Sequence, residues 1–221
     1  MTAGPRRWRI WYRFAAPIVD RAVAGVALIV LGPLLLLMAA LIKRDSPGPA
    51  LFRQERVGRD GRRFTMLKFR SMHVGVSDAR HRAYVTGLLT GTGTHADAAT
   101  SDGVYKLEND DRVTRIGRVL RRSGADELPQ LVNVLRGEMA LVGPRPALDY
   151  EVELYHPADH ERFAVPPGIT GLWQATSRNE VDMRTMLDLD RRYVATRSPL
   201  LDIRIIARTI AGAVSRRGGA R

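Results

Sequence analysis

The residues best suited to chemistry are two adjacent carboxylates, Asp126 and Glu127, and an arginine between two prolines, Arg145. Pro129 fits the first turn of a helix because it has no backbone N–H to donate, so we expect a helix to begin near Asp126 with Asp126 as its N-cap. Helix starts favour phosphate nearby, and an arginine on stiff backbone suits bidentate phosphate recognition. Together these residues indicate chemistry on an anionic substrate, with a phosphate as the leading candidate.

Two plainer interpretations of the same residues stay open. Asp126 could do no more than cap the helix, with Ser123 completing a capping box. Arg145 could belong to a rigid surface turn. Apolar residues recur at helical spacing after the carboxylates and predict a buried helix face, which comprises Leu128, Leu131, Val132 and Leu135.

An uncharged apolar segment covers residues 22–42, and it meets the roughly 20 residues that a helix needs to cross a bilayer. Gly32 and Pro33 lie at its centre, where proline removes a hydrogen bond and kinks a helix. Basic residues lie on both sides of the segment, and such flanks prefer the cytoplasm. If both ends stay there, the segment enters the membrane and returns as a re-entrant helix–break–helix. The alternative is a kinked transmembrane helix.

Two strand-like runs on either side of an Asp-Gly turn signal, Asp60-Gly61, predict a β-hairpin over residues 51–70. Lys68 and Arg70 would share one face of its second strand, near the end of the apolar segment. They would then be either binding residues or part of a solvated basic strand.

Further helices are expected over residues 113–122, 181–196 and 200–214, and a rigid turn is expected over residues 165–171. Trp173, just after that turn, is expected to pack in the core or at an interface and not to stack on a base. The 200–214 segment is amphipathic with a basic rim, so it could lie on anionic lipid or pack on the core. Residues 74–103 are poor in large apolar side chains after Leu89 and predict a flexible insertion, either a lid or a plain loop.

Composition narrows the class of protein. A chain of 221 residues is long enough for one domain with a core, and a net charge of +12 fits nucleic acid, an anionic membrane face or anionic substrates. The absence of cysteine excludes disulfides, thiolate metal sites and cysteine nucleophiles. No small-residue cleavage site follows the apolar segment, so we do not expect a cleaved signal peptide. No helix-turn-helix, zinc-finger or RNA-binding aromatic pattern is present, so nucleic acid is not an expected partner.

Six motifs occur in order along the chain: Ser46-Pro47-Gly48-Pro49, Gln54-Glu55-Arg56-Val57-Gly58, Lys68-Phe69-Arg70-Ser71-Met72, Arg112-Val113-Thr114-Arg115-Ile116-Gly117, the run from Asp126 to Pro146, and Pro167-Gly168-Ile169-Thr170-Gly171-Leu172-Trp173-Gln174. On these motifs the sequence resembles the bacterial sugar transferases, the monotopic polyprenyl-phosphate phosphoglycosyl transferases of the short form. The resemblance runs from about Asp20 to Asp202, which is nearly the whole chain.

The resemblance implies an α+β fold in which a re-entrant membrane helix–break–helix precedes a small, mainly helical cytoplasmic catalytic domain. That domain would carry a β-hairpin and amphipathic helices at the membrane surface. The expected boundaries are a basic N-terminal segment over residues 1–17, the membrane hairpin over residues 18–45 with its break at Gly32 and Pro33, and the catalytic domain over residues 46–221. The expected location is the bacterial inner membrane, with the catalytic domain on its cytoplasmic face.

The resemblance also implies a reaction. A phosphosugar would pass from a nucleoside-diphosphate sugar, expected to be a UDP-sugar, to a polyprenol phosphate, expected to be undecaprenyl phosphate. The products would be a polyprenol-diphosphate-sugar and a nucleoside monophosphate, in the first membrane step of exopolysaccharide, O-antigen or glycoprotein glycan assembly. In the mechanism that the resemblance implies, Asp126 attacks the sugar-linked phosphorus, and polyprenol phosphate then attacks the covalent aspartyl phosphosugar.

Glu127 is the second carboxylate of the implied catalytic pair, and Arg145, Lys68 and Arg121 are the expected phosphate contacts. A carboxylate that attacks a diphosphate needs cations beside it, since each like-charge pair at about 4 Å costs on the order of 4 kcal/mol at an effective dielectric of about 20. We therefore expect Mg²⁺, with Asp126 and Glu127 as its protein ligands. The residues alone do not separate the nucleophile from the metal ligand. Inner-membrane lipid and a second copy of the chain, as a homodimer, complete the expected partners.

Two other functions remain open. The chain could be a membrane-tethered basic binding or scaffold protein without catalysis, although the intact Asp126-Glu127 pair and Arg145 argue against this. It could also transfer the phosphosugar in one step, without a covalent intermediate. Release of nucleoside monophosphate before any lipid acceptor is added would separate the two mechanisms.

Overall fold

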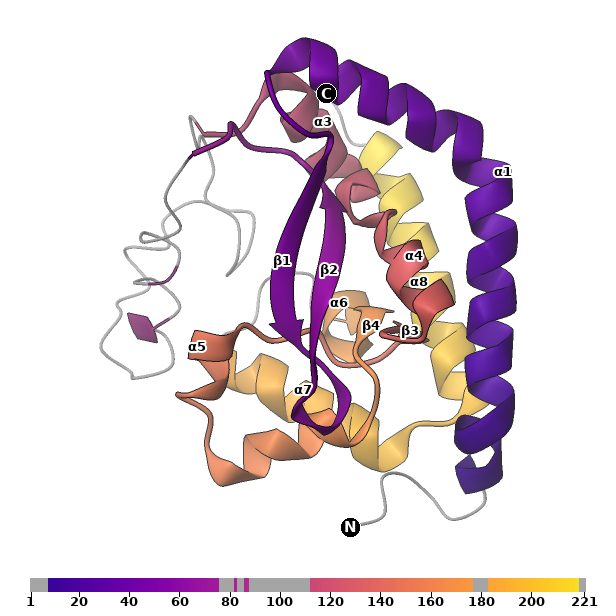
Figure 1. The fold of residues 1–221 in the computed structure, drawn as a ribbon. Helices are drawn as coiled ribbons and strands as arrows, with labels where there is room; N and C mark the ends of the chain where they lie inside the picture. Colours follow the sequence, from indigo (N-terminus) through magenta and orange to yellow (C-terminus); the bar gives the residue numbers. More distant parts are fainter. Residues whose placement is uncertain (1–7, 76–81, 83–85, 88–111, 177–182, 219–221) are drawn as a thin grey trace.

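The computed structural model describes residues 8–75, 82, 86–87, 112–176 and 183–218. These residues are mostly helical, with one antiparallel two-stranded sheet and one parallel two-stranded pair (Figure 1). Most of the insertion expected over residues 74–103 lies outside the described residues, as does the start of the helix expected from residue 181.

A long apolar helix, α1 (Ala16–Asp45), lies along one side of the molecule after a π-helical turn, Trp11–Ala15. The helix continues through Pro33 and bends partway along its length (Figure 1). An interior proline removes one hydrogen bond and crowds the preceding turn, which accounts for a bend. The chain therefore stays helical on both sides of Pro33, and no extended break separates two helices.

Trp11–Asp45 is, within the described residues, the one helix long and apolar enough to cross a membrane. Most of its large apolar side chains are exposed. The exposed ones are Phe14, Ile18, Val19, Val23, Val26, Ile29, Val30, Leu34, Leu36, Leu37 and Leu41. An exposed apolar surface of this extent marks a site that contacts membrane or another protein. Helix α1 could therefore anchor the protein in a membrane.

The predicted β-hairpin is confirmed. Strand β1 (Leu51–Val57) pairs antiparallel with β2 (Arg63–Phe69), and Leu51 lies opposite Phe69. The turn at Arg59–Gly61 needs two left-handed residues, Asp60 with φ 56° and Gly61 with φ 73°, which explains the Asp-Gly pair.

The second edge of β2 is held by a side chain of α4 (Gln130–Arg136). The Leu67 N–H donates to Asn133 Oδ1 at 3.0 Å, and Asn133 Nδ2 donates to the Thr65 carbonyl at 2.8 Å. The Asn133 amide thus takes the place of a third strand, and it fixes β2 against α4.

The helix expected to begin at Asp126 begins later. Helix α3 (Arg115–Ser123) ends at Gly124, whose φ of 70° closes it, and a 3₁₀ turn, Ala125–Glu127, follows before α4 starts at Gln130. The prediction that Asp126 is an N-cap was wrong, because Asp126 lies inside that turn.

The buried face of α4 is also shifted from the predicted one. Leu131 and Val134 are buried in one cluster with Ala24 of α1. Gln130 and Asn133 of α4 are also buried, whereas Leu135 is 45% exposed. The late start of α4 places the face between α1 and β2, and two polar residues occupy part of it.

The segment between α4 and the C-terminal helices makes the parallel pair, β3 (Ala140–Val142) and β4 (Gly168–Thr170), so the expected rigid turn includes a short strand. A Cβ on Gly168 would lie 2.1 Å from the Gly143 nitrogen, so only glycine permits this approach. Short helices α5 (Asp149–Val152), η6 (Pro157–Ala164) and α6 (Leu172–Thr176) complete this part.

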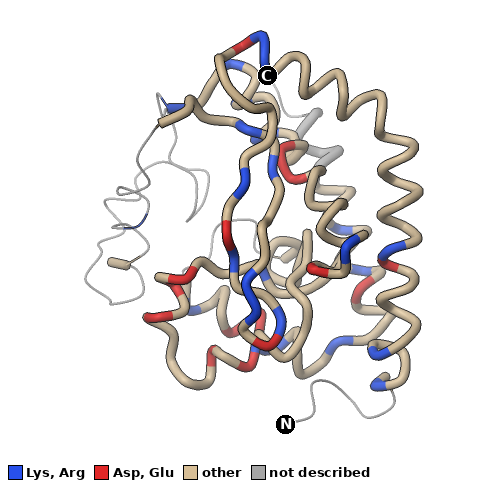
Figure 2. Tube along the Cα trace, in the orientation of Figure 1, with Lys and Arg blue, Asp and Glu red and all other residues tan. Residues whose placement is uncertain are grey.

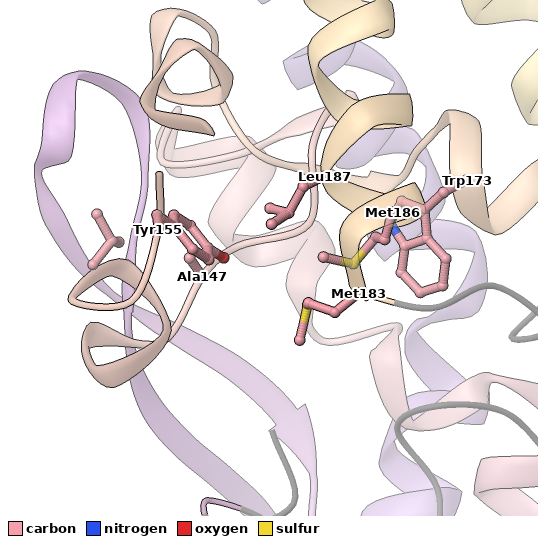
Figure 3. Close-up of a cluster of buried hydrophobic side chains, with 7 residues drawn as sticks. Ala147, Tyr155, Trp173, Met183, Met186 and Leu187 are labelled. Atoms are coloured by element: carbon pink, nitrogen blue, oxygen red, sulfur yellow. The ribbon is translucent and has the colours of Figure 1, made fainter. Parts of the chain in front are cut away.

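Two longer helices close the described chain, α7 (Met183–Thr196) and α8 (Pro199–Gly218). Trp173 is 4% exposed and belongs to a buried cluster with Met183, Met186 and Leu187, which confirms it as a core residue (Figure 3).

Helix α8 packs through Ile205, which is buried beside Tyr193. On the side predicted to be apolar, Ile206 packs partly buried against the same cluster, whereas Leu200, Ile203 and Ile210 are exposed. Packing of that side on the core is therefore excluded for these three residues, while contact with lipid stays open.

Candidate functional site

A cavity of about 1520 Å³ opens between the hairpin, the second half of α1, the Ala125–Glu127 turn and α8. All five polar side chains singled out in the sequence line it: Lys68, Arg121, Asp126, Glu127 and Arg145. Gly32 and Pro33 are not among the described lining residues, but their neighbours Leu31 and Leu34 are. Tertiary structure thus brings together residues that lie up to 77 positions apart, since Lys68 and Arg145 face one cavity.

The polar wall of this cavity is basic. Two of its described lining residues are acidic, Asp126 and Glu127, and nine are Lys or Arg: Lys43, Arg53, Arg56, Lys68, Arg70, Arg112, Arg121, Arg145 and Arg208. Figure 2 shows basic residues recurring along both strands of the hairpin. A cleft lined by one sign of charge concentrates ligands of the opposite sign, so the cavity favours anions.

Part of the cavity wall is apolar, and most of this part comes from α1. Leu31, Leu34, Met38 and Ala39 line the cavity from this helix, and Phe52 and Leu51 of β1 add to them. A cavity with one basic and one apolar wall suits an amphiphile whose head is anionic and whose tail is hydrocarbon.

The two carboxylates lie in the 3₁₀ turn that links α3 to α4. Asp126 is 8% exposed, whereas the Glu127 side chain is 41% exposed. Lys68 Nζ donates to Glu127 Oε1 at 2.9 Å, so β2 and the turn are joined by an ion pair at the cavity wall. Lys68 is therefore not part of a merely solvated strand.

Two further arginines connect this site to the end of α1. Arg121 Nε donates to Ser71 Oγ at 2.9 Å, which fixes α3 beside the end of the hairpin. Arg70 is buried and donates to the carbonyls of Ser46 at 2.7 Å and Pro47 at 2.6 Å. These carbonyls lie where the chain leaves α1, so Arg70 satisfies backbone groups there, a role that its sequence motif did not reveal.

Arg145 lies at the cavity wall and not in a surface turn, since its side chain is 19% exposed. Its Nη1 lies 3.5 Å from Oε1 of Glu151, a buried carboxylate of α5. Burial raises the pKa of Glu151, but Arg145, Arg56 and the Leu148 N–H outweigh it, so the pKa lies below its ordinary value and Glu151 is ionised.

Four buried charged residues beside Arg145 were missed from the sequence: Arg56, Glu151, Arg162 and Asp190. Arg56 was visible only as part of a motif. The other three lie on separate elements with no diagnostic spacing, so no sequence signal could have found them. Burial lowers the pKa of Arg56 to about 10, with the charge of Arg145 adding to the effect, and Arg56 stays protonated at neutral pH.

A divalent cation fits the carboxylate pair by its donor chemistry. Asp126 and Glu127 offer hard oxygen ligands, which Mg²⁺ prefers, and Mg²⁺ needs only one or two protein carboxylates beside phosphate oxygens and water. Within the described ranges, no group of three or more His, Cys, Asp or Glu side chains is placed to hold a metal ion. A cation at this carboxylate pair would take its remaining ligands from substrate phosphate and water.

Fold and site together define a class: proteins with an apolar N-terminal helix beside a basic cavity that carries a carboxylate pair. Residues 11–216 match the family model described as Bacterial sugar transferase. The chain belongs to the bacterial sugar transferase family, as the resemblance of its motifs predicted.

Proteins of several bacteria are similar to this chain over most of its length. A UDP-galactose-lipid carrier transferase of Erwinia amylovora is 41% identical over 208 residues, which are 94% of this chain and 42% of the relative. Exopolysaccharide production protein ExoY of Sinorhizobium fredii is 39% identical over 199 residues, which are 90% of this chain and 85% of the relative. A UDP-glucose:undecaprenyl-phosphate glucose-1-phosphate transferase of Caulobacter vibrioides is 39% identical over 202 residues, with 87% and 67% covered.

The chain spans less than half the length of some of these relatives. It covers 42% of the Erwinia protein and 44% of galactosyl transferase CpsE of Streptococcus agalactiae. The similarity therefore concerns one part of those longer proteins, and most of the length of ExoY.

Proposed function

We propose that this chain is a phosphoglycosyl transferase that moves a phosphosugar from a nucleoside-diphosphate sugar to a polyprenol phosphate. The products are a polyprenol-diphosphate-sugar and a nucleoside monophosphate. The observation that carries the proposal is one cavity that is lined by Asp126, Glu127, Lys68 and Arg145 and also by apolar residues of α1. The names of the Erwinia and Caulobacter relatives support a UDP-sugar donor, and the Caulobacter name supports undecaprenyl phosphate as the acceptor.

The two walls of the cavity match the two substrates. The basic wall attracts the diphosphate of the donor, and Arg145 and Lys68 offset its charge. The apolar wall accommodates the first isoprene units of the acceptor, whose phosphate then lies near the same carboxylates. Arg121, at the other side of the turn, is a further phosphate contact.

Transfer proceeds in two displacements. A carboxylate oxygen of Asp126 attacks the sugar-linked phosphorus, the bond to the bridging oxygen breaks, and the nucleoside monophosphate leaves with the electron pair. A phosphate oxygen of the polyprenol phosphate then attacks the same phosphorus, and the bond to Asp126 breaks. The Asp126 carboxylate is restored, so each turnover consumes only donor and acceptor.

Glu127 and Lys68 prepare the first displacement. Their ion pair places one ammonium at Glu127, the residue next to the attacking Asp126, and its positive charge lowers the repulsion between Asp126 and the donor phosphates. Glu127 would also hold a Mg²⁺ ion, which would supply further positive charge to the donor diphosphate. Assigning the attack to Asp126 and metal binding to Glu127 is part of this proposal.

The membrane topology belongs to the same proposal. Helix α1 enters the inner membrane and returns to the cytoplasmic face, with its bend at Gly32 and Pro33. The exposed apolar residues of α8, Leu200 and Ile203, lie at the membrane surface, and Tyr12 ties the two helices by donating to Asp202 at 2.7 Å. Residues 46–221 then form the catalytic domain on the cytoplasmic side.

The proposal is tested with purified full-length protein, a panel of nucleoside-diphosphate sugars and Mg²⁺. Nucleoside monophosphate should appear with donor alone, at about one equivalent per active site, and continuous turnover should need polyprenol phosphate. Intact-mass analysis should show the mass of one phosphosugar added to the wild type and none added to Asp126→Asn.

Each outcome separates one alternative. Monophosphate release that always needs the acceptor would establish one-step transfer. Full activity in Asp126→Asn would assign the attack to another group. No release with any donor and acceptor would favour a binding or scaffold protein.

A further inference from the structure

The main chain of Arg145 is fixed by three donors that come from separate elements. The Pro144 carbonyl accepts from the Gly168 N–H at 2.9 Å and the Pro146 carbonyl from Arg56 Nη1 at 3.0 Å. Between them, the Arg145 carbonyl accepts from Arg162 Nη2 at 2.7 Å. Proline limits φ on both sides of Arg145, but these contacts decide where its side chain leaves the backbone.

The side chain of Arg145 meets a carboxylate that is itself fixed. Glu151 Oε2 accepts from the Leu148 N–H at 2.9 Å, and Oε1 lies 3.5 Å from Arg145 Nη1. The Glu151 side chain is 2% exposed, so it has no access to a ligand in the cavity. Any effect of Glu151 on a ligand is therefore exerted through Arg145.

The Arg162 guanidinium has two further buried partners, Asp190 and Tyr155. Its Nη2 lies 2.6 Å from Asp190 Oδ2, its Nη1 donates to the Tyr155 hydroxyl, and both ionised side chains are at most 2% exposed. Burying an ion pair this fully contributes little to stability, because desolvation offsets the attraction. A gain in stability therefore does not account for the number of buried charges around Arg145.

We propose that Glu151, Arg162 and Arg56 are positioning residues for Arg145, holding its guanidinium at the cavity wall so that it binds a diphosphate in one geometry. Arg162 and Arg56 fix the backbone on the C-terminal side of the Arg145 side chain, through the carbonyls of Arg145 and Pro146, and Glu151 fixes one edge of the guanidinium. The inference rests on the proposed function, in which that diphosphate belongs to a nucleoside-diphosphate sugar.

Glu151→Gln gives a test whose sign is informative. The amide keeps the shape and an acceptor for the Leu148 N–H, but it removes a negative charge beside the cavity. By charge alone, an anion should then bind more tightly. Loss of positioning predicts the opposite, with inorganic pyrophosphate and UDP binding about tenfold more weakly and KM for the donor rising more than kcat falls.

The test is a double-mutant cycle on the full chain, read by calorimetric binding of pyrophosphate in the presence of Mg²⁺. Glu151→Gln should weaken binding in the wild-type background and change nothing in the Arg145→Ala background. Asp149→Asn is the matched control, because Asp149 lies in the same helix and pairs with Arg63 at 3.0 Å, but neither residue lines the cavity. It should bind as the wild type does.

Tighter binding by Glu151→Gln, or an equal loss in both backgrounds, would overturn the positioning role. If Glu151→Gln does not fold, Arg162→Lys repeats the cycle, since lysine keeps the charge beside Asp190 but loses the fork that also reaches the Arg145 carbonyl. Pyrophosphate binding needs no turnover, so a positive cycle without transfer would reject only the proposed function. Normal transfer with no coupling would reject only the positioning role.

Discussion

Replacing Lys68 with methionine should abolish most activity while leaving the fold intact. The substitution keeps the length of the side chain but removes the ammonium that lies 2.9 Å from Glu127 Oε1. In the proposed reaction this ammonium also offsets the donor phosphates. Its interaction with one phosphate charge at about 4 Å and an effective dielectric of about 20 is on the order of 4 kcal/mol.

This energy sets the expected loss of rate. Since 1.36 kcal/mol corresponds to a tenfold change, about 4 kcal/mol corresponds to roughly a 10³-fold loss, and partial solvent access reduces it to between roughly 10² and 10³. The stability cost is small by comparison. Both partners of the ion pair are partly exposed, at 24% and 41%, and such pairs contribute about 1 kcal/mol or less, which lowers the Tm by about 2–4 °C for a chain of this size.

The assay compares kcat/KM for nucleoside monophosphate release with thermal unfolding of the same preparations. Arg63→Met is the matched control, since Arg63 is a basic residue of β2 whose ion pair with Asp149 is exposed and lies away from the cavity. It should keep wild-type activity. A Lys68→Met variant within fivefold of the wild type would refute the electrostatic argument, and a Tm lowered by more than about 10 °C would show that Lys68 is mainly structural.

Three further predictions concern other parts of the molecule. Arg145→Lys keeps the charge but loses the fork, so donor turnover should fall at least about tenfold, and wild-type kinetics would reduce Arg145 to a point charge. Burial raises the pKa of Asp190 to about 6, against the opposing charges of Arg162 and Arg145, so the folded state holds more protons than the unfolded state between about pH 4 and 6. The stability contributed by Asp190 is therefore present below about pH 4 and lost by about pH 6. The difference in unfolding free energy between the wild type and Asp190→Asn should fall as the pH rises through that window. A difference that stays constant would contradict the raised pKa. For the topology, single cysteines at Thr2 and at the exposed Pro47 should both resist an impermeant thiol reagent in intact cells and react in inverted vesicles. Labelling at Thr2 alone in intact cells would contradict the re-entrant form. Wild-type activity in Pro33→Leu would contradict it as well.

The local features of the fold could be predicted from the sequence because they depend on neighbouring residues. An Asp-Gly pair adopts two left-handed conformations in succession, so the hairpin turn at Asp60 and Gly61 was visible. Gly124 ends α3 for the same reason. The apolar segment over residues 22–42 indicated a helix in an apolar environment, and the ordered motifs indicated the family.

Local patterns failed where tertiary packing sets the answer. Helical spacing placed Leu135 on a buried face, and Pro129 placed a helix start near Asp126. In the structure α4 begins at Gln130, and Asn133 faces the edge of β2. The apolar side of α8 was correctly periodic, yet periodicity does not say whether protein or lipid covers it.

The candidate site was likewise predicted in part from the sequence and determined in part by the tertiary structure. Residue types and the resemblance of the motifs indicated Asp126, Glu127, Lys68, Arg121 and Arg145 as candidates, because carboxylates and cations carry the chemistry of phosphate wherever they lie. Only the tertiary structure brought them to one cavity and paired Lys68 with Glu127. It also surrounded Arg145 with Glu151 and Arg162, residues whose spacing carries no signal, because a buried charge is recognised by the partners that fold against it and not by its neighbours in the chain.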